Sequence, residues 1–373
     1  MPFITDRLHA VRRDEQLKSA LANENVRDIS HDNGAATASF LNSRFSFDMG
    51  LVERELRGSI IGQDSAINEL LEVLKVVRAD IGDPRKPLAS LLFCGPTGVG
   101  KTETVRIVAR ALYGDADAMC RIDMNTLAQE HYAASFTGAP PGYVGSKEGT
   151  TILDQEKIEG TRNLPGIVLL DELEKASNEV VLALLNVFDN GLLTVASGER
   201  TYSFRNSIIF MSSNLGAREL MDLDDKRGGL LSILKGKVKD RRTRAHDIVM
   251  KSLLERFPPE FVNRIDHVNT FNWIDRKTIP SLVDVELERL NLRLRKHDVV
   301  VTLTDPARNL ICEMGYDRRF GARGLKRAIR RHLEFPLATF LLEPNTKNGY
   351  LDGTGTVRLT AHLRDDRIVF DHA

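Results

Sequence analysis

The apolar positions in the central part of the chain form short continuous runs. Three such runs lie at residues 90–94, 166–170 and 206–211. Strands that are apolar along their whole length are typical of parallel sheets buried on both faces. Amphipathic stretches separate the runs, one of them at 103–112, so we expect a three-layer α/β fold with helices on both faces of a parallel sheet.

The pattern changes in the last quarter of the chain, where helical periodicity mixes with shorter strand-like runs. This order predicts a smaller C-terminal α+β domain. Its expected helices are residues 279–294 and 324–341, and its expected strands are residues 299–303, 356–359 and 367–370.

These patterns divide the chain into three parts. Residues 1–50 are polar and charged and predict an extension that is partly helical or flexible, with a role left open between a mobile segment and a partner-docking helix. Residues 51–273 form the expected large α/β domain, and residues 274–373 the small one. Residues 222–247 carry eight Lys and Arg side chains and predict a solvated surface loop, with a specific binding element as the alternative.

Composition narrows the class of protein. The chain has 373 residues with 52 Lys and Arg against 52 Asp and Glu. This balance excludes a globally basic nucleic-acid coat protein and an acidic disordered tail, although a local basic groove stays open. We find no apolar run long enough for a membrane span, and no apolar signal core near the N-terminus. Three distant cysteines indicate neither disulfides nor a zinc cluster, so a cytoplasmic enzyme is expected.

A phosphate-binding motif follows the first apolar run. Residues 95–102 fit G-x-x-x-x-G-K-[ST] between a predicted strand and a predicted helix. The glycines let backbone amides surround phosphates, Lys101 can reach the β- and γ-phosphates, and the Thr102 hydroxyl can ligate Mg²⁺. The expected ATP-binding residues are Gly95, Pro96, Thr97, Gly98, Val99, Gly100, Lys101, Thr102 and Glu103.

Polar side chains end the second and third apolar runs. Asp171 can hold Mg²⁺ through water, and Glu172 can polarise an attacking water. A helix N-cap would explain Asp171 alone, but not the pair combined with a phosphate loop. Asn214 follows the third run, where it could orient the same water, although a turn or cap asparagine is the simpler interpretation of that residue alone.

A glycine- and proline-rich stretch separates the two nucleotide motifs. Within it, Gly142, Tyr143, Val144 and Gly145 place an aromatic–aliphatic pair on a loop. Composition alone favours burial of this pair in the core over an exposed position in which the pair would hold another molecule. Arg264 and Arg323 are single arginines that composition alone assigns to the surface or to ion pairs.

Together these motifs resemble a known family. From about residue 51 onward, the chain resembles the second ATPase module of the Clp-type AAA+ unfoldases, as a stand-alone single-ring form. The strings that carry the resemblance are GPTGVGKTE (95–103), GAPPGYVG (138–145), LLDELEKA (169–176), SSNLG (212–216), PEFVNRID (259–266) and GYDRRFGARGLKRAI (315–329), with IIGQ at 60–63. A generic phosphate-loop enzyme would share only the first and third of these longer strings.

The resemblance implies roles for residues that composition leaves open. Ile60 and Ile61 would lie near the adenine, and Asn214 would be the first sensor of the nucleotide. Arg264 would be an arginine finger that acts on ATP of the neighbouring subunit, and Arg323 a second sensor in the small domain. The pore loop would be Gly142, Tyr143, Val144 and Gly145. This role reverses the preference for burying the aromatic–aliphatic pair in the core.

The same resemblance implies assembly and partners. Family members form hexamers and thread unfolded or aggregated proteins through a central pore, with ATP and Mg²⁺ as cofactors. A ClpP-like peptidase is a further implied partner, for which residues 228–231 are a weak docking candidate. Membranes are not implied as a partner. A nucleic-acid motor, a regulatory subunit of a ClpP-like protease and a non-catalytic nucleotide-binding scaffold are the alternatives.

The chain departs from the family at several positions. Pro258 stands where an interface arginine is frequent, and Ser135 where another arginine is frequent before the pore loop. Residues 193–200 lack the usual Asp-Gly-Gln-Gly run, which puts a second pore loop in doubt. The folded N-terminal domain, the first ATPase module and the middle domain of double-ring relatives have no counterpart, so docking of a DnaK-type chaperone is not expected.

Overall fold

The computed structural model describes residues 42–129, 136, 152–195, 200–225, 238–317, 321–343 and 356–372, without the side chains of 222–225 and 238–242. The chain divides into two compact units, Met1–Asn42 and Ser43–Ala373, and the described helices and strands belong to the second. The helix and linker expected within residues 1–41 lie outside the described residues, so the predicted extension stays a prediction. Phe45 and Phe47, which the sequence division placed in that extension, are buried in the core.

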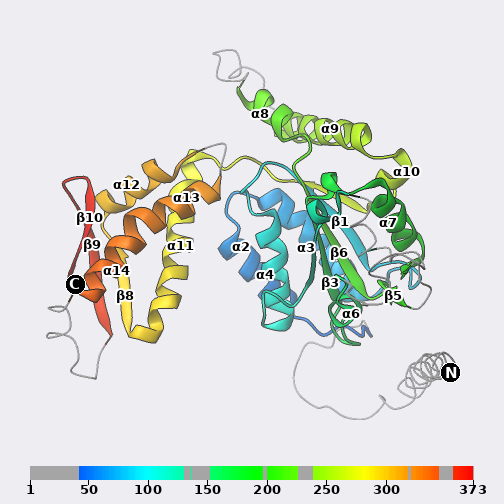
Figure 1. Cartoon of the computed structure of the whole chain (residues 1–373), viewed down its shortest axis with the longest axis horizontal. Coiled ribbons are helices and arrows are strands. Elements are labelled where there is room, and N and C mark those ends of the chain that lie inside the picture. The colour runs from blue at the N-terminus through cyan, green and yellow to red at the C-terminus, as the bar shows by residue number, and fades with distance from the viewer. Residues whose placement is uncertain are drawn as a thin grey trace, which may run out of the picture. The chain divides into compact units, whose positions relative to one another are not determined.

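The centre of this unit is a five-stranded sheet in the order β2-β3-β6-β1-β7, and every pair in it is parallel (Figure 1). The three apolar runs form its three central strands, whose residues are all buried. The expected parallel sheet is therefore confirmed. Its strands are β1 (Ala89–Cys94), β2 (Cys120–Asp123), β3 (Gly166–Asp171), β6 (Ser207–Ser213) and β7 (His267–Thr270).

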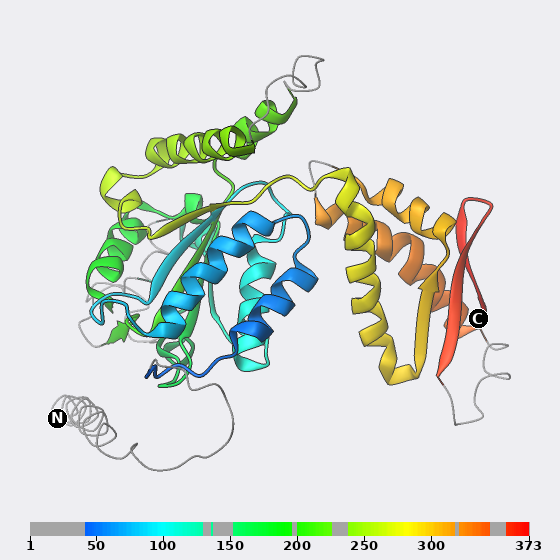
Figure 2. The same cartoon turned by 180° about the vertical axis from the view of Figure 1, so that it is seen from behind.

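Helices cover both faces of the sheet, because successive side chains of a strand point to opposite faces. Leu91 and Phe93 pack into a core with α2 (Met49–Ser59), α3 (Asp64–Ala79) and α4 (Lys101–Tyr113), which cross one face in blue and cyan in Figure 2. Leu92 and Cys94 pack on the other face, into a second core. That core contains residues of α6 (Gln155–Glu159), α7 (Asn178–Asn190), α9 (Val238–Arg256) and α10 (Pro259–Val262), which completes the predicted three layers.

One expectation for the basic segment is wrong. Residues 222–247 were expected in a surface loop, but 222–225 form the end of α8 (Ala217–Asp225) and 238–247 the first half of α9. Lys and Arg are good helix formers, and the apolar positions that dock the helix come later, at Ala245, Val249 and Leu253. The remaining short elements of this part are η1 (Met124–Leu127), η2 (Leu173–Lys175), β4 (Leu192–Thr194) and β5 (Thr201–Ser203).

The C-terminal part has the predicted α+β character. Its sheet has the order β10-β9-β8, with β8 parallel and β10 antiparallel to β9. The single helix expected at 324–341 is instead interrupted by a π-helical turn, because Pro336 has no N–H to continue the α-helical ladder. The elements are η4 (Arg276–Thr278), α11 (Ile279–Leu294), η5 (Arg295–His297), β8 (Val299–Leu303), α12 (Asp305–Gly315), α13 (Ala322–Ile329), η6 (Arg330–Glu334), α14 (Phe335–Leu342), β9 (Val357–Arg364) and β10 (Arg367–His372).

Among the described residues, none of the helices combines the length and the apolar composition that a membrane span requires.

Candidate active site

The loop between β1 and α4 has a backbone that only glycine adopts easily. Gly95, Gly98 and Gly100 have φ angles of 144°, 74° and 109°. A Cβ atom on Gly95 would lie 2.4 Å from the Phe271 carbonyl oxygen, so a side chain there would push the loop off β7. The glycines of the motif are thus required by conformation and by space.

Lys101, the first residue of α4, is buried behind this loop. Its Nζ donates hydrogen bonds to the carbonyl oxygens of Gly95 (2.5 Å) and Pro96 (2.7 Å) and to Asn214 Oδ1 (3.0 Å). Burial lowers the pKa of Lys101 from 10.5 to about 8. Among the described residues, no carboxylate forms a salt bridge with this ammonium, so an anionic ligand such as a phosphate suits it.

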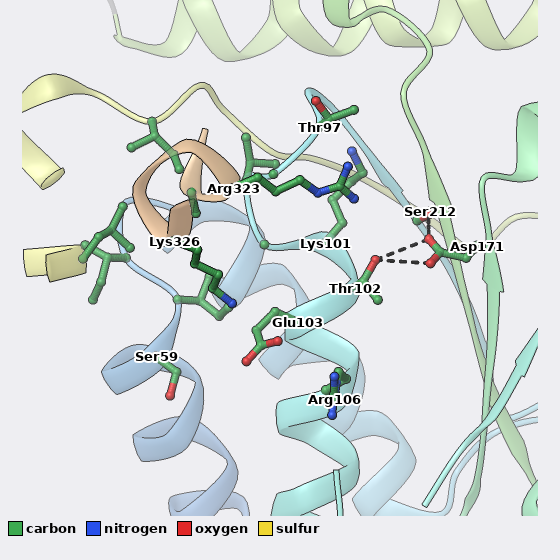
Figure 3. Close-up of a pocket in the computed structure, with 18 of the residues that line it drawn as sticks. Ser59, Thr97, Lys101, Thr102, Glu103, Arg106, Asp171, Ser212, Arg323 and Lys326 are labelled. Carbon is green, nitrogen blue, oxygen red and sulfur yellow. Dashed lines mark hydrogen bonds between the residues drawn. The ribbon is translucent and has the colours of Figure 1, made fainter. Parts of the chain in front are cut away.

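Asp171 ends β3 and interacts with three donors, of which Ser212 and Thr102 are labelled in Figure 3. Its carboxylate accepts hydrogen bonds from the Ser212 hydroxyl and, at 3.3 Å, from Thr102 Oγ1. Arg121 on β2 forms a salt bridge with its other oxygen at 2.7 Å. One carboxylate and two hydroxyls gathered at one point are hard oxygen ligands of the kind that Mg²⁺ prefers, so this group of residues fits that ion.

Glu172 has an unusual backbone conformation directly after Asp171. Its φ is 57°, in the left-handed region, and its N–H donates to Ser212 Oγ at 3.1 Å. Such a conformation costs about 1 kcal/mol or more for a residue with a side chain. It turns the chain at the tip of β3, where Glu172 lines the same cavity as Lys101 and Thr102.

Asn214 follows β6 and is held from two sides. Its Oδ1 accepts from Lys101, while its backbone N–H and its Nδ2 both donate to Glu174 Oε1, at 3.2 and 3.1 Å. The backbone of η2, which carries Glu174, is held in turn by Arg256 of α9, whose Nε donates to the Glu174 carbonyl at 2.9 Å. The amide of Asn214 therefore has one defined orientation, with its oxygen toward Lys101.

A cavity of about 300 Å³ extends from this polar group toward the C-terminal part. Ile60 and Ile61, which the resemblance places near the adenine, are among its apolar lining residues. The turn that carries them is tied to the segment leading to α11 by Gln63, whose side-chain amide exchanges hydrogen bonds of 2.8 and 2.9 Å with the backbone of Asn272. The other apolar lining residues are Val99, Ile274, Leu282, Val285 and Ala322.

Residues of the C-terminal part close one side of the cavity. Arg323 reaches toward Lys101 from α13 (Figure 3), and Lys326 lines the wall one turn further along that helix. Arg289 of α11 forms a salt bridge of 2.7 Å with Glu103 of α4. The predicted residues Glu103 and Arg323 thus both line the cavity, Glu103 from α4 and Arg323 from α13.

Arg264 lies away from this cavity. Its Nε donates to Asp189 Oδ1 at 2.5 Å and its Nη1 to the Glu260 carbonyl at 2.9 Å. Its own carbonyl accepts from Ser90 near the amino-terminal end of β1, whereas the phosphate loop follows the carboxyl end. From Ser90 to Gly95, at about 3.3 Å per residue, the strand separates the Arg264 backbone from the start of the loop by roughly 16 Å.

Two predicted segments cannot be placed. The pore-loop residues Gly142, Tyr143, Val144 and Gly145 and the docking candidate at 228–231 lie outside the described residues. Their roles stay predictions.

The sequence did not reveal several residues that contact the predicted ones. These are Arg121, Glu174 and Arg289, which hold Asp171, Asn214 and Glu103. A charged residue within a short strand or on a helix has no local pattern that names its partner. Residues 171–174 contain three carboxylates, and Glu174 is the third. Its closeness in sequence to Asp171 and Glu172 was the one signal that could have indicated a role at the site.

Comparison with known families matches both parts of the chain. Residues 86–268 match the family described as "AAA domain (Cdc48 subfamily)". Residues 274–350 match the family described as "C-terminal, D2-small domain, of ClpB protein".

Individual relatives agree with these matches. The chain is 54% identical, over 99% of both sequences, to "ATP-dependent protease ATP-binding subunit-like protein AmiB" of Pseudomonas aeruginosa. It is 44% identical to "ATP-dependent protease ATP-binding subunit-like protein" of Rhodococcus erythropolis, over 80% of this chain and 84% of the relative. It is 38% identical to ClpC/MecB of Bacillus subtilis over 83% of this chain, but covers 38% of that longer protein.

Solved structures show the same relationship. A yeast Hsp104:casein complex in an extended conformation superposes with a TM-score of 0.71 at 29% identity, covering 86% of this chain and 52% of the Hsp104 chain. The nucleotide motifs, the two family matches and the full-length relative agree. The chain belongs to the Clp-type AAA+ ATPases, is related to their second ATPase module, and is an ATP-hydrolysing enzyme.

Proposed function

We propose that this chain works as a hexameric protein unfoldase, which hydrolyses Mg²⁺–ATP at the cavity between α4 and α13 and threads polypeptides through a central pore. The observation that carries this proposal is the position of Arg264. The cavity is lined by Lys101, Glu172 and Arg323 among others. Arg264, which the family resemblance makes an arginine finger, lies instead beside Asp189. A site completed by another subunit explains both positions.

Different residues of the cavity would carry out different steps of ATP hydrolysis. Lys101 and the loop amides bind the phosphates, and Thr102 and Asp171 are the residues that would hold Mg²⁺, which supplies positive charge to the β- and γ-phosphates when bound. Glu172 accepts a proton from the attacking water. At the same time the oxygen of that water forms a bond to the γ-phosphorus, and the bond between the γ-phosphorus and the leaving ADP oxygen breaks. Asn214, fixed by Glu174, orients that water.

The arginine finger requires neighbouring subunits. The side chain of Arg264 is about one-third exposed, and its ion pair with Asp189 is at the surface, where solvent screens the attraction between charges. The guanidinium can therefore leave Asp189 for a phosphate of an adjacent subunit at little cost. A closed ring gives every site one such neighbour, and a cyclic arrangement is the usual closed solution for head-to-tail contacts.

The threading part of the proposal rests on the resemblance and on the relatives. Tyr143 and Val144 match the family's pore-loop string in sequence, and the Hsp104 structure is described as a complex with casein. Movement of the small domain during hydrolysis would displace this loop along the pore axis.

The test measures ATP turnover and unfolding separately. We expect an unfolded protein such as casein to stimulate ATPase activity, and DNA to leave it unchanged. Tyr143→Ala should keep basal ATPase activity and lose unfolding of a fluorescent substrate protein, whereas Tyr143→Phe should keep both. Unfolding by Tyr143→Ala at the wild-type rate would contradict threading, and stimulation by DNA would favour a nucleic-acid motor.

The chain covers most of the length of the Pseudomonas aeruginosa and Rhodococcus erythropolis relatives, and the names of these two proteins favour a second candidate function. Both are described as similar to ATP-binding subunits of ATP-dependent proteases. The chain would then deliver polypeptides to a ClpP-like peptidase, with residues 228–231 as the docking candidate. Loss of ATP-dependent degradation in Leu230→Ser, with its ATPase activity intact, would support this role, and failure of wild type to bind a cognate peptidase would exclude it.

A further inference from the structure

The first residues of α13 lie directly on the backbone of the phosphate loop. The Ala322 N–H donates a hydrogen bond to the Gly98 carbonyl oxygen at 2.9 Å. Ala322 is the first residue of its helix, and the first four N–H groups of a helix have no acceptor within it. The Ala322 N–H finds its acceptor outside the helix, in the Gly98 carbonyl oxygen, 224 residues earlier in the sequence (322 − 98).

Gly321 makes this approach possible. Its φ is 51°, and a Cβ atom there would lie 2.8 Å from the Gly98 oxygen and 3.2 Å from the Thr97 oxygen. Contacts below 3.0 Å to backbone atoms leave no room for even a methyl group. An alanine at 321 would have to lift α13 off the loop or shift the loop itself.

The hydrogen bond also sets the direction of an amide of the loop. The C=O of Gly98 and the N–H of Val99 belong to one peptide plane and point in opposite directions, because the peptide bond is trans. When Ala322 holds the carbonyl, the Val99 N–H is directed away from α13. Amides of such loops are the groups that bind phosphates.

We propose that the Gly321–Ala322 backbone of the small domain is a positioning element of the nucleotide site, which orients the 98–99 peptide for phosphate binding. The contact is independent of the side chain of Arg323, which reaches into the cavity beside it. The Glu103–Arg289 ion pair joins α4 and α11 at a second point, so the same two parts of the chain meet there too. The inference rests on ATP binding at this site, and not on the ring or on threading.

The experiment measures the affinity of the whole chain for a fluorescent ADP, without a substrate protein. Gly321→Ala introduces the clashing methyl group, and Ala322→Pro removes the N–H at a helix position where proline is well tolerated. Gly114→Ala is the matched control, because Gly114 also has a positive φ (76°) but no atom within 4 Å of its Cβ position. Thermal unfolding verifies that each variant is folded.

We expect Gly321→Ala and Ala322→Pro each to weaken ADP binding on the order of 3- to 10-fold, the loss corresponding to one hydrogen bond. Gly114→Ala should bind like wild type. Amide hydrogen exchange gives a second readout: the Ala322 N–H should be protected in wild type and exchange faster in Gly321→Ala. Wild-type affinity in Ala322→Pro, or an unprotected Ala322 N–H in wild type, would overturn the proposal. Failure of threading assays would leave these results unaffected.

Discussion

Glu174 holds Asn214 by two hydrogen bonds to a single carboxylate oxygen, one from the backbone N–H and one from the side-chain Nδ2. This pairing leaves the Asn214 carbonyl oxygen to face Lys101. We predict that Glu174→Ala lowers kcat for ATP hydrolysis about 10- to 100-fold and changes the nucleotide Kd less than 3-fold, because a freed amide can flip and misplace the water. Steady-state ATPase and equilibrium binding measure the two effects.

Glu179→Ala provides the control for that variant, since Glu179 is an exposed glutamate on the neighbouring helix α7. It should leave both constants unchanged. A Glu174→Ala enzyme whose loss lies in nucleotide binding, with kcat preserved, would mean that Glu174 shapes the pocket without orienting Asn214.

The buried Lys101 gives the ligand-free protein a pH-dependent stability. Its pKa is lowered by burial from 10.5 to about 8, so between these values the unfolded chain binds more protons than the folded one. The cost of burying the charge is fully present below pH 8 and is relieved as the pH rises toward 10.5. We predict that Lys101→Met raises Tm by about 3 °C at pH 7, and that this gain shrinks as the pH approaches 10.

The exposed Lys75 offers a comparison at the same pH values. Its ammonium pairs with Glu72 on the surface of α3 and is 59% exposed. Lys75→Met should change Tm little, and equally at pH 7 and pH 10. A Lys101→Met gain that does not depend on pH would show that packing, and not the charge, limits stability at this position.

The separation of Arg264 from the cavity of its own subunit makes a prediction about mixtures. Arg264→Ala should lower kcat about 10³-fold, as expected for an arginine finger, and leave the nucleotide Kd within 2-fold. Glu172→Gln should be equally inactive. Mixing the two variants should restore part of the activity, because some interfaces then combine an intact Glu172 with an intact Arg264.

Arg205→Ala controls for removal of an exposed arginine, since among the described residues its side chain donates a hydrogen bond to the Asn190 carbonyl and forms no ion pair. It should hydrolyse ATP like wild type. If the mixture of Arg264→Ala and Glu172→Gln has no more activity than the separate variants, Arg264 does not act on a neighbouring subunit.

Much of the large domain could be predicted because its signals are local. The apolar runs that became β1, β3 and β6 are contiguous, and the phosphate-loop motif immediately follows one of them. The carboxyl ends of neighbouring parallel strands meet at one edge of a sheet, so Lys101 and Asn214 come within 3.0 Å. The positions of these residues followed from topology, while their roles remain predictions.

The residues that hold this group in place could not be predicted from local pattern. Glu174 and Arg121 find their partners 40 and 50 residues away, and Arg289 finds Glu103 at a separation of 186 residues. Each of these contacts depends on how strands or domains pack, which a single sequence does not encode at the residue itself. The helical start of α9 could not be predicted for a related reason, because two of its three buried apolar residues, Val249 and Leu253, lie after the charged segment.

The ion pair between Glu103 and Arg289 predicts coupling between α4 and the small domain. Both side chains are about one-third exposed or less, and Arg289 also pairs with Glu286 at 2.9 Å. A double-mutant cycle of Glu103→Ala and Arg289→Ala on the free energy of ADP binding should give a coupling of about 0.5–1 kcal/mol. The coupling should fall as salt rises from 50 mM to 500 mM, since exposed charges are screened.

The Lys75–Glu72 pair is the matched control for this cycle, because it lies within one helix and joins no two parts of the chain. Its cycle on ADP binding should give no coupling at either salt concentration. Arg289→Ala removes ion pairs with both Glu103 and Glu286, and among the described residues Lys326 then remains as a partner of Glu286 at 3.6 Å. Because this variant loses two ion pairs and Glu103→Ala loses one, it should weaken ADP binding more than Glu103→Ala does. Additive effects of the two substitutions would mean that α4 and α11 do not communicate through this pair, and that the small domain is held at the site by the backbone contact at Ala322.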